Sequence, residues 1–271
     1  MPRRKEVAVK KDDTLPADIA DLIYADIGSG LENMTADDFA IPRLAILQSN
    51  SPQVDKRGEG YIEGAEPSMI IENVSNGTFD GEKGIVVVPI SYRRTIIEWG
   101  LRENGGGFVA DHGYNPSLLK ELKPVVVKEK TYMLNDKGNQ LIDTAEYFVY
   151  IVDGDTWSPS VISMSSTQMR KSKRWNTLID SVKLTAPDGR RVSAAAYFMS
   201  YKLTTVPESN EKGSWFGWDI KKNGKTIDLE FGKNIYLEAR EFNNQIKSGD
   251  VKVADPVAES GTTVESEDSP M

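Results

Sequence analysis

A series of short strand-like segments between residues 85 and 220, separated by turn-forming residues, constrains the fold more than any other feature. Residues 85–89 are fully apolar, and residues 91–99 are rich in β-branched and aromatic side chains. These two segments could form one strand that bends or bulges around Pro89. Further strands are expected at residues 44–47, 125–134, 146–152, 161–164, 192–206 and 215–220.

Short turns connect several of these segments. Residues 135–138 and the pair Asn223-Gly224 contain residues that tolerate a positive φ, so each predicts a hairpin turn. Short turns join antiparallel neighbours, because parallel strands need longer crossovers. The sequence therefore predicts an α+β fold that is predominantly antiparallel β, in which an OB-like or related β-barrel carries two or three helices.

The clearest helix is predicted at residues 165–182. Ser165 and Ser166 are suitable N-cap residues, because a hydroxyl oxygen can accept a free backbone N–H at a helix start. At about 100° per residue one stripe of this helix is apolar and the opposite face is cationic. The apolar stripe holds Trp175, Leu178, Ile179 and Val182, the cationic face holds Arg170, Lys173 and Arg174, and Lys171 lies near the border. Other helices are expected near residues 16–27, 115–122 and 229–248, the last ending at Gly249.

The charge of −8 is unevenly distributed along the chain. Residues 1–38 contain nine acids and five bases, and residues 250–271 contain six acids and one base, so the middle carries +1. We predict a flexible N-terminal arm with a short helix at residues 1–38, a β-rich nucleic-acid-binding core at 39–249, and a disordered acidic tail at 250–271. Residues 170–191 carry a local charge of +5, which suggests an anionic partner, although a solvated helix face explains it equally well.

Several classes of chemistry are absent from the sequence. There is no cysteine, so disulfides and thiolate sites are excluded, and His112 is the only histidine, so His-based triads are excluded too. We expect His112 to be solvated and Asp153 and Asp155 to form a turn. No phosphate-loop, nucleophile-elbow or zinc-protease motif is present, and no run reaches the roughly 18 apolar residues that span a membrane. The sequence therefore predicts a soluble, unsecreted protein without catalytic site, cofactor or metal.

What remains is a binding constellation for single-stranded DNA. Aromatic rings can stack on bases while cations contact phosphates. Six rings crowd two predicted strands, although at least three of them are expected to pack in the core, as is Trp175. We predict that phosphates contact Arg170, Lys171, Lys173 and Arg174, with Arg190, Arg191 and Lys202 as secondary contacts, and that bases stack on Tyr201, Trp215 and Trp218.

The sequence resembles phage-encoded single-stranded DNA-binding proteins, which combine an OB-like β-barrel with an acidic C-terminal tail. The resemblance rests on residues 41–48 with Ser51-Pro52, on residues 167–175, and on the aromatic strand before Asn210. It implies a role in phage DNA replication or recombination in the host cytoplasm. The acidic tail would then recruit phage replication proteins or occupy the DNA site until a strand displaces it.

Two alternative functions stay open. The same β-rich domain could serve as a structural or assembly protein of the virion through protein contacts. A metal-dependent enzyme acting on nucleic acid would need carboxylates such as Asp153 and Asp155. The sequence leaves open whether the chain forms a homo-oligomer.

Overall fold

The computed structural model separates into two units, Met1–Asp38 and Phe39–Met271. The first unit contains α1 (Ala20–Ala25), which lies inside the range predicted for a short helix. Most of the predicted arm and the tail beyond Pro256 lie outside the described residues. The structure describes residues 19–26, 29–30, 32, 40–101, 106–127, 130–211, 213–249, 251 and 253–256.

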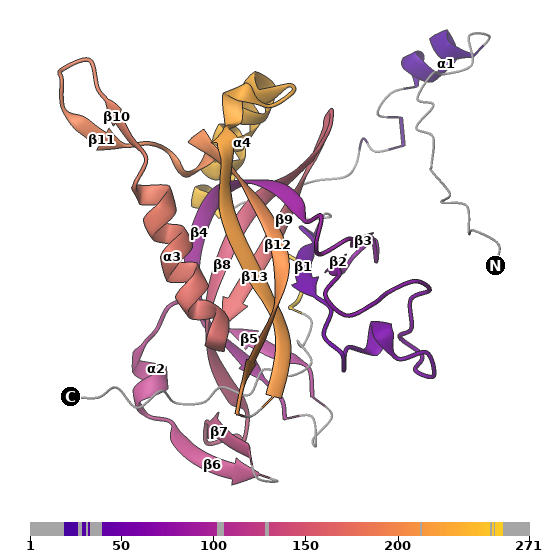
Figure 1. Cartoon of the computed structure of the whole chain (residues 1–271), viewed down its shortest axis with the longest axis vertical. Helices are drawn as coiled ribbons and strands as arrows, with labels where there is room; N and C mark the ends of the chain where they lie inside the picture. Colours follow the sequence, from indigo (N-terminus) through magenta and orange to yellow (C-terminus); the bar gives the residue numbers. More distant parts are fainter. Residues whose placement is uncertain are drawn as a thin grey trace. The chain divides into compact units, whose positions relative to one another are not determined.

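An eleven-stranded sheet, curled into a half-barrel, dominates the described part of the second unit (Figure 1). Its main path has the order β13-β12-β4-β8-β9-β1-β2-β3. Apart from the parallel pair of β1 and β9, the paired strands are antiparallel. The strands are β1 (Arg43–Ile46), β2 (Ile70–Glu72), β3 (Thr78–Phe79), β4 (Ile85–Trp99), β5 (Phe108–Asp111), β6 (Lys123–Val127), β7 (Lys130–Leu134), β8 (Gln140–Asp153), β9 (Thr156–Ser165), β12 (Met199–Asn210) and β13 (Gly213–Lys225). The predicted α+β, mostly antiparallel class is confirmed, and the half-barrel is consistent with an OB-like or related barrel.

Helices and one small hairpin complete this unit. The predicted basic helix is present as a 3-10 turn, η4, that leads into α3, and a separate two-stranded hairpin of β10 and β11 follows it (Figure 1). The predicted last helix is α4, and Gly249 ends it in the left-handed conformation, with φ of 85°. The bounds are η2 (Pro52–Val54), α2 (Ser117–Lys120), η4 (Ser166–Gln168), α3 (Met169–Asp180), β10 (Lys183–Thr185), β11 (Arg191–Ser193), η5 (Ala196–Phe198), η6 (Thr226–Asp228) and α4 (Gly232–Ser248).

The irregular strand predicted around Pro89 is confirmed. β4 runs through Pro89 as one strand, and its register with β8 shifts between Pro89 and Ser91. Proline has no N–H to donate to a ladder, so a bulge accommodates it within the strand. Val87 lies in one buried cluster, whereas Val88 and Ile90 lie in another.

Three strand predictions are wrong. Residues 125–134 are not one strand but parts of the β6–β7 hairpin. Residues 192–206 are interrupted by η5, so β11 and β12 are separate strands. Asn223-Gly224 is not a turn: β13 continues through it, because Ser200 and Met199 on β12 still pair with Gly224 and Lys225. The β12–β13 hairpin turns instead between Asn210 and Gly213, at the far end of both strands.

Two hydrophobic clusters account for most of the core. The first contains side chains of β4, β8, β9, β12 and β13, and α3 packs on it through Trp175, Leu178 and Ile179. The second includes Ile235, Ala239 and Phe242 of α4. The two long helices therefore bury different sets of strand side chains, and only the first set lies beneath the basic helix.

The side-chain amides of Gln48 and Gln168 form hydrogen bonds with the backbone of the edge strand β13. Gln48 donates from Nε2 to the carbonyl oxygen of Phe216 at 2.9 Å and accepts from the N–H of Phe216 at 2.8 Å. Gln168 accepts from the N–H of Trp218 at 3.1 Å. Each amide thereby takes the place of a neighbouring strand for one residue of β13.

The chain beyond α4 returns to the core. Val253 forms a parallel bridge with Ile41, and the N–H of Ala254 donates to the carbonyl oxygen of Ile41 at 2.9 Å. Val251 and Val253 pack on the second cluster. The predicted core boundary at residue 249 is therefore too early, because these residues still contact the sheet.

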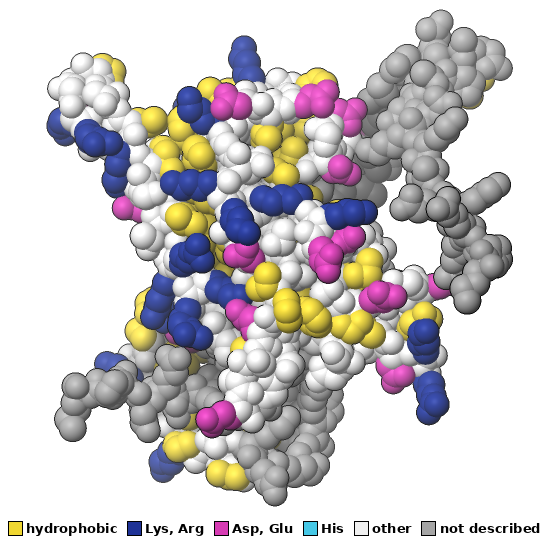
Figure 2. Space-filling view, viewed as in Figure 1, with side chains coloured by type: hydrophobic (Ala, Val, Ile, Leu, Met, Phe, Trp, Pro, Cys, Tyr) yellow, Lys and Arg dark blue, Asp and Glu magenta, His cyan; other side chains and the backbone are white. Residues whose placement is uncertain are grey.

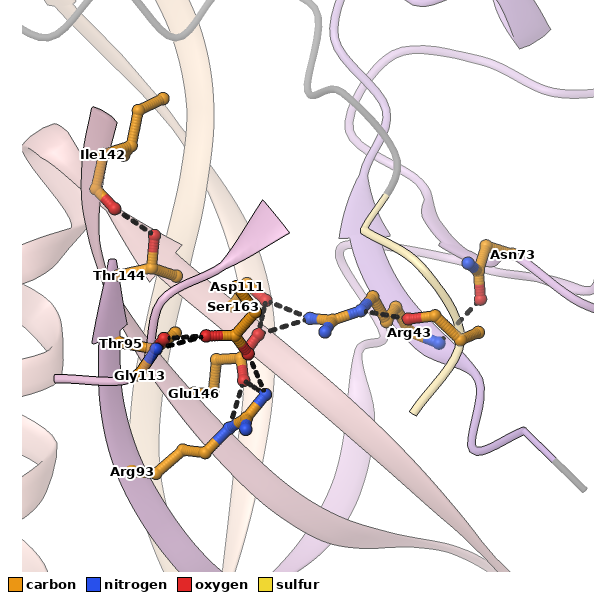
Figure 3. Close-up of polar contacts among 11 residues, drawn as sticks. Arg43, Asn73, Arg93, Thr95, Asp111, Gly113, Ile142, Thr144, Glu146 and Ser163 are labelled. Carbon is orange, nitrogen blue, oxygen red and sulfur yellow. Dashed lines mark hydrogen bonds and ion pairs between the residues drawn. The ribbon is translucent and has the colours of Figure 1, made fainter. Parts of the chain in front are cut away.

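A buried ionic network joins five strands (Figure 3). Glu146 on β8 is fully buried, and Arg43 on β1 and Arg93 on β4 each contact one of its carboxylate oxygens at 2.6 Å. Arg93 also contacts Asp111 on β5 at 2.9 Å, and Arg43 reaches Ser163 on β9. Burial disfavours the charge of Asp111, but hydrogen bonds from Thr95 and Gly113 hold its pKa below the ordinary value.

We predict that Glu146→Leu destabilises the fold by about 3–5 kcal/mol, because Arg43 is left buried without a counter-ion. Urea unfolding measures the loss. The matched control is Asp219→Asn, which breaks the pair with the exposed Lys221 and should cost less than about 1 kcal/mol. The double variant Arg43→Met/Glu146→Leu should regain part of the stability, and a double variant no more stable than Glu146→Leu would contradict the explanation.

Candidate nucleic-acid interface

Aromatic contacts hold α3 on the sheet. The ring of Trp175 is fully buried and stacks on Tyr147 of β8 with centroids 4.2 Å apart. The hydroxyl of Tyr147 lies 2.9 Å from both the carbonyl oxygen of Ser172 and Oδ1 of Asn176. Burial raises the pKa of Tyr147, so the hydroxyl stays protonated and able to donate. These contacts fix which face of α3 points outward.

The outward face of α3 is cationic, as the sequence predicts. Arg170, Lys173 and Arg174 are exposed, and within the described part of the chain none of the three has an ion-pair or hydrogen-bond partner for its side chain. Figure 2 shows Lys and Arg side chains gathered over α3 and the β10–β11 hairpin on the left of the view. We call these three residues the α3 cations.

The start of the helix differs from the prediction. Gln168, rather than Ser165 or Ser166, precedes the first α-helical residue, and no side chain caps α3 there. Ser165 precedes η4 in extended conformation and makes no side-chain cap. The 3-10 turn places Gln168 where its amide reaches both Trp218 and Glu208. This turn therefore helps to hold the edge strand β13 in place.

Lys171 is neutralised by an acid that the sequence analysis did not single out. Its Nζ lies 2.6 Å from Oε1 of Glu208 on β12. Nε1 of Trp215 donates to Oε2 of the same carboxylate at 2.9 Å, and Gln168 donates to it at 3.3 Å. Lys171 and Trp215 are therefore brought together beside α3, although Lys171 is not a free cation. Trp215 remains partly exposed.

The secondary cations are not equivalent. Arg190 is exposed but pairs with Asp188 at 2.6 Å, and Nζ of Lys202 donates to the carbonyl oxygen of Gly84 at 3.2 Å. Arg191 is exposed on β11 without an ion-pair partner among the described residues. Lys222 of β13, which no sequence pattern singled out, donates to Ser181 at the C-terminal end of α3 and so lies beside the basic helix.

Two of the three predicted stacking residues are wrong. Tyr201 is fully buried and Trp218 is 3% exposed, both in the cluster beneath α3. Burial raises the pKa of Tyr201 to about 12. A base cannot reach either ring face, so these residues pack the core.

Exposed rings lie elsewhere, on residues that the sequence analysis did not select. Tyr92 on β4 and Tyr114 after β5 are about half exposed, and so is Phe231 before α4. Tyr92 borders the cluster beneath α3, because its ring centroid lies 5.1 Å from that of Tyr147. In the sequence Tyr92 is a single aromatic residue between Ser91 and Arg93, and no pattern there predicts a binding role.

His112 is not simply solvated. Its Nε2 lies 2.7 Å from Oε2 of the buried Glu98, and Asn135 and Asn139 also donate to this carboxylate. Hydrogen bonding, mainly from Asn139, holds the pKa of Glu98 below its ordinary value. These contacts tie the start of β8 and the end of β5 to β4.

Asp153 ends β8 and Asp155 lies in the turn before β9. Across the described ranges there is no group of three or more His, Cys, Asp or Glu residues arranged to hold a metal ion. None of the described helices has the length and apolar character needed to cross a membrane.

One comparison with known proteins gives a match. The model of a family described as Pam3 phage gp34-like protein matches residues 10–252, most of the 271-residue chain. No curated protein and no solved structure matches.

We predict that Tyr147→Phe destabilises the protein by about 1–3 kcal/mol, because the buried Ser172 and the partly buried Asn176 lose the hydroxyl that they contact. The control Tyr114→Phe removes a hydroxyl from an exposed ring and should change the stability by less than about 0.5 kcal/mol. Thermal unfolding followed by circular dichroism compares the two. Equal effects would show that the Tyr147 hydroxyl does not anchor α3.

Proposed function

The chain belongs to the Pam3 phage gp34-like protein family, and on that premise we propose that it is a bacteriophage single-stranded DNA-binding protein acting in DNA replication or recombination. It would act without catalysis, cofactor or metal, by neutralising phosphates and stacking bases. A phage protein that coats exposed strands would work in the host cytoplasm.

The observation that carries this proposal is the outward face of α3. Arg170, Lys173 and Arg174 present three cations without counter-ions among the described residues, on a protein whose net charge is −8. An acidic protein that keeps cations unpaired on one helix has a local field suited to a polyanion. Trp215 shares the carboxylate of Glu208 with Lys171 of α3. Tyr92 packs on Tyr147, whose hydroxyl contacts Ser172 and Asn176 of α3.

The arrangement suits an unpaired strand. Cations that track phosphates give affinity without sequence preference, and rings beside them accept any base by stacking. Lys222 lies beside the C-terminal end of α3, and Arg191 lies on the hairpin that follows this end, so both would extend the path beyond it. We also propose that the acidic C-terminal residues bind phage replication proteins.

A structural or assembly role in the virion is the second candidate. The β10–β11 hairpin favours it, because Leu184 and Val192 face each other across the two strands and are each about 40% exposed. An apolar pair on a protruding hairpin is suited to protein contacts. Co-purification with phage particles, together with no binding to single strands, would select this candidate.

We predict that the wild-type protein binds a fluorescent oligo-dT with an affinity that falls steeply and linearly on a log–log plot against salt. Replacing Arg170, Lys173 and Arg174 with glutamine should make the slope shallower by about 2, at about 0.7 per lost phosphate contact. Fluorescence anisotropy at several salt concentrations measures both slopes.

The control replaces Lys56, Arg57 and Lys83 with glutamine, which changes the net charge equally at exposed positions outside α3. This control should keep the wild-type slope. Absent binding in low salt, or an equal change of slope in both triple variants, would overturn the assignment of the α3 cations.

A further inference from the structure

We infer that Tyr92, Arg94 and Tyr114 form a base-stacking site that receives unpaired bases of the strand whose phosphates lie on α3. The inference rests on the proposed function and adds the part of the site that Tyr201 and Trp218 cannot supply. Its ligand class is a single-stranded polynucleotide, because the bases of a duplex are already stacked on each other.

A rigid row of aromatic rings supports Tyr92. Its ring lies 5.1 Å from Tyr147 with the planes at 55°, and Tyr147 stacks on the buried Trp175. The Tyr92 side of this row is open, since Tyr92 is 42% exposed whereas Tyr147 and Trp175 are fully buried. The ring is therefore held in place from below and accessible from outside, which lowers the entropy cost of stacking a base on it.

Arg94 and Tyr114 continue the same face. Tyr92 and Arg94 are two residues apart on β4 and pair with Tyr147 and Ala145 of β8, so both side chains lie on the α3 side of the sheet. The guanidinium of Arg94 lies 5.1 Å from the centroid of the Tyr114 ring, which is 53% exposed. Its hydrogen bonds to Asp143 raise the pKa of Arg94, so the cation is permanent and fixed in orientation.

Tyr147 connects α3 to this site. The hydroxyl of Tyr147 contacts Ser172 and Asn176, so this side of α3 lies beside Tyr147, the ring on which Tyr92 packs. Lys173 follows Ser172 in the sequence and is exposed. A strand that leaves the α3 cations at Lys173 therefore meets Tyr92 next and then Arg94 with Tyr114, without crossing the sheet.

Charge and ring chemistry together select the ligand. A planar guanidinium beside two exposed phenol rings offers flat faces on which bases can stack. Arg94 is already paired with Asp143, so it adds little net attraction for an anion. The contribution expected here is thus from bases rather than from phosphates.

An abasic oligonucleotide separates the two contributions. The wild-type protein should bind oligo-dT more tightly than an oligonucleotide of equal length that has the sugar–phosphate backbone without bases. The variant Tyr92→Ala/Tyr114→Ala should bind oligo-dT at least about tenfold more weakly and the abasic strand unchanged, since stacking contributes roughly 1–3 kcal/mol per base. Its salt slope should equal that of the wild type, because no cation is removed.

Three further variants test whether the loss of binding comes from the rings of Tyr92 and Tyr114. Tyr92→Phe/Tyr114→Phe keeps both rings and should retain wild-type binding. Phe231→Ala removes a ring that is 50% exposed but lies beside Trp157, which packs on the other hydrophobic cluster, and should also bind as wild type. Tyr114→Ala alone should show a smaller loss on oligo-dT only, and it carries the test if loss of the Tyr92 ring unfolds the protein.

The outcomes distinguish this inference from the proposed function. Equal affinity of the wild-type protein for oligo-dT and the abasic strand, or an unchanged preference in Tyr92→Ala/Tyr114→Ala, would overturn the stacking site while leaving the α3 cations intact. Binding of neither oligonucleotide in low salt would overturn the proposed function and this inference together.

Discussion

The buried carboxylate of Glu146 is the interaction on which the described sheet depends. Arg43 and Arg93 each contact one of its two oxygens, and the three residues come from three different strands. Arg43 also donates from Nε to the carbonyl oxygen of Ala254 at 2.7 Å, which fastens the chain beyond α4. A buried charge is tolerated only when it is paired in this way. Segments that are distant in sequence are therefore locked into one arrangement, and β4 and β8 are fixed as the platform beneath α3.

Local signals predicted much of the fold. The apolar stripe of α3, the irregularity at Pro89 and the stop at Gly249 each depend on near neighbours. The structure contains all three, except that Val182 of the predicted stripe lies beyond the end of α3. The failures came where tertiary pairing overrides local preference. Asn223-Gly224 favours a turn in isolation, but β12 pairs with β13 on both sides of Asn223, so the pair forms a bulge within the strand.

The candidate site was predictable only in part, for the same reason. Helical periodicity gave the direction of Arg170, Lys173 and Arg174, because a helix has one buried stripe. Strand periodicity tells which rings share a face but not whether a helix covers that face, so Tyr201 and Trp218 were misassigned. The conspicuous sequence segments around Arg43, Gln48 and Gln168 prove to build the sheet, while exposed Tyr92 and Tyr114 stand in unremarkable surroundings.

The amides of Gln48 and Gln168 have a consequence for self-association. They occupy backbone groups of Phe216 and Trp218 along the outer side of β13, where another molecule would otherwise add a strand. At the other end of the main strand path, β3 has only two residues and offers few backbone groups to which another strand could pair. Copies of this chain at high concentration would therefore resist edge-to-edge aggregation at these two strands.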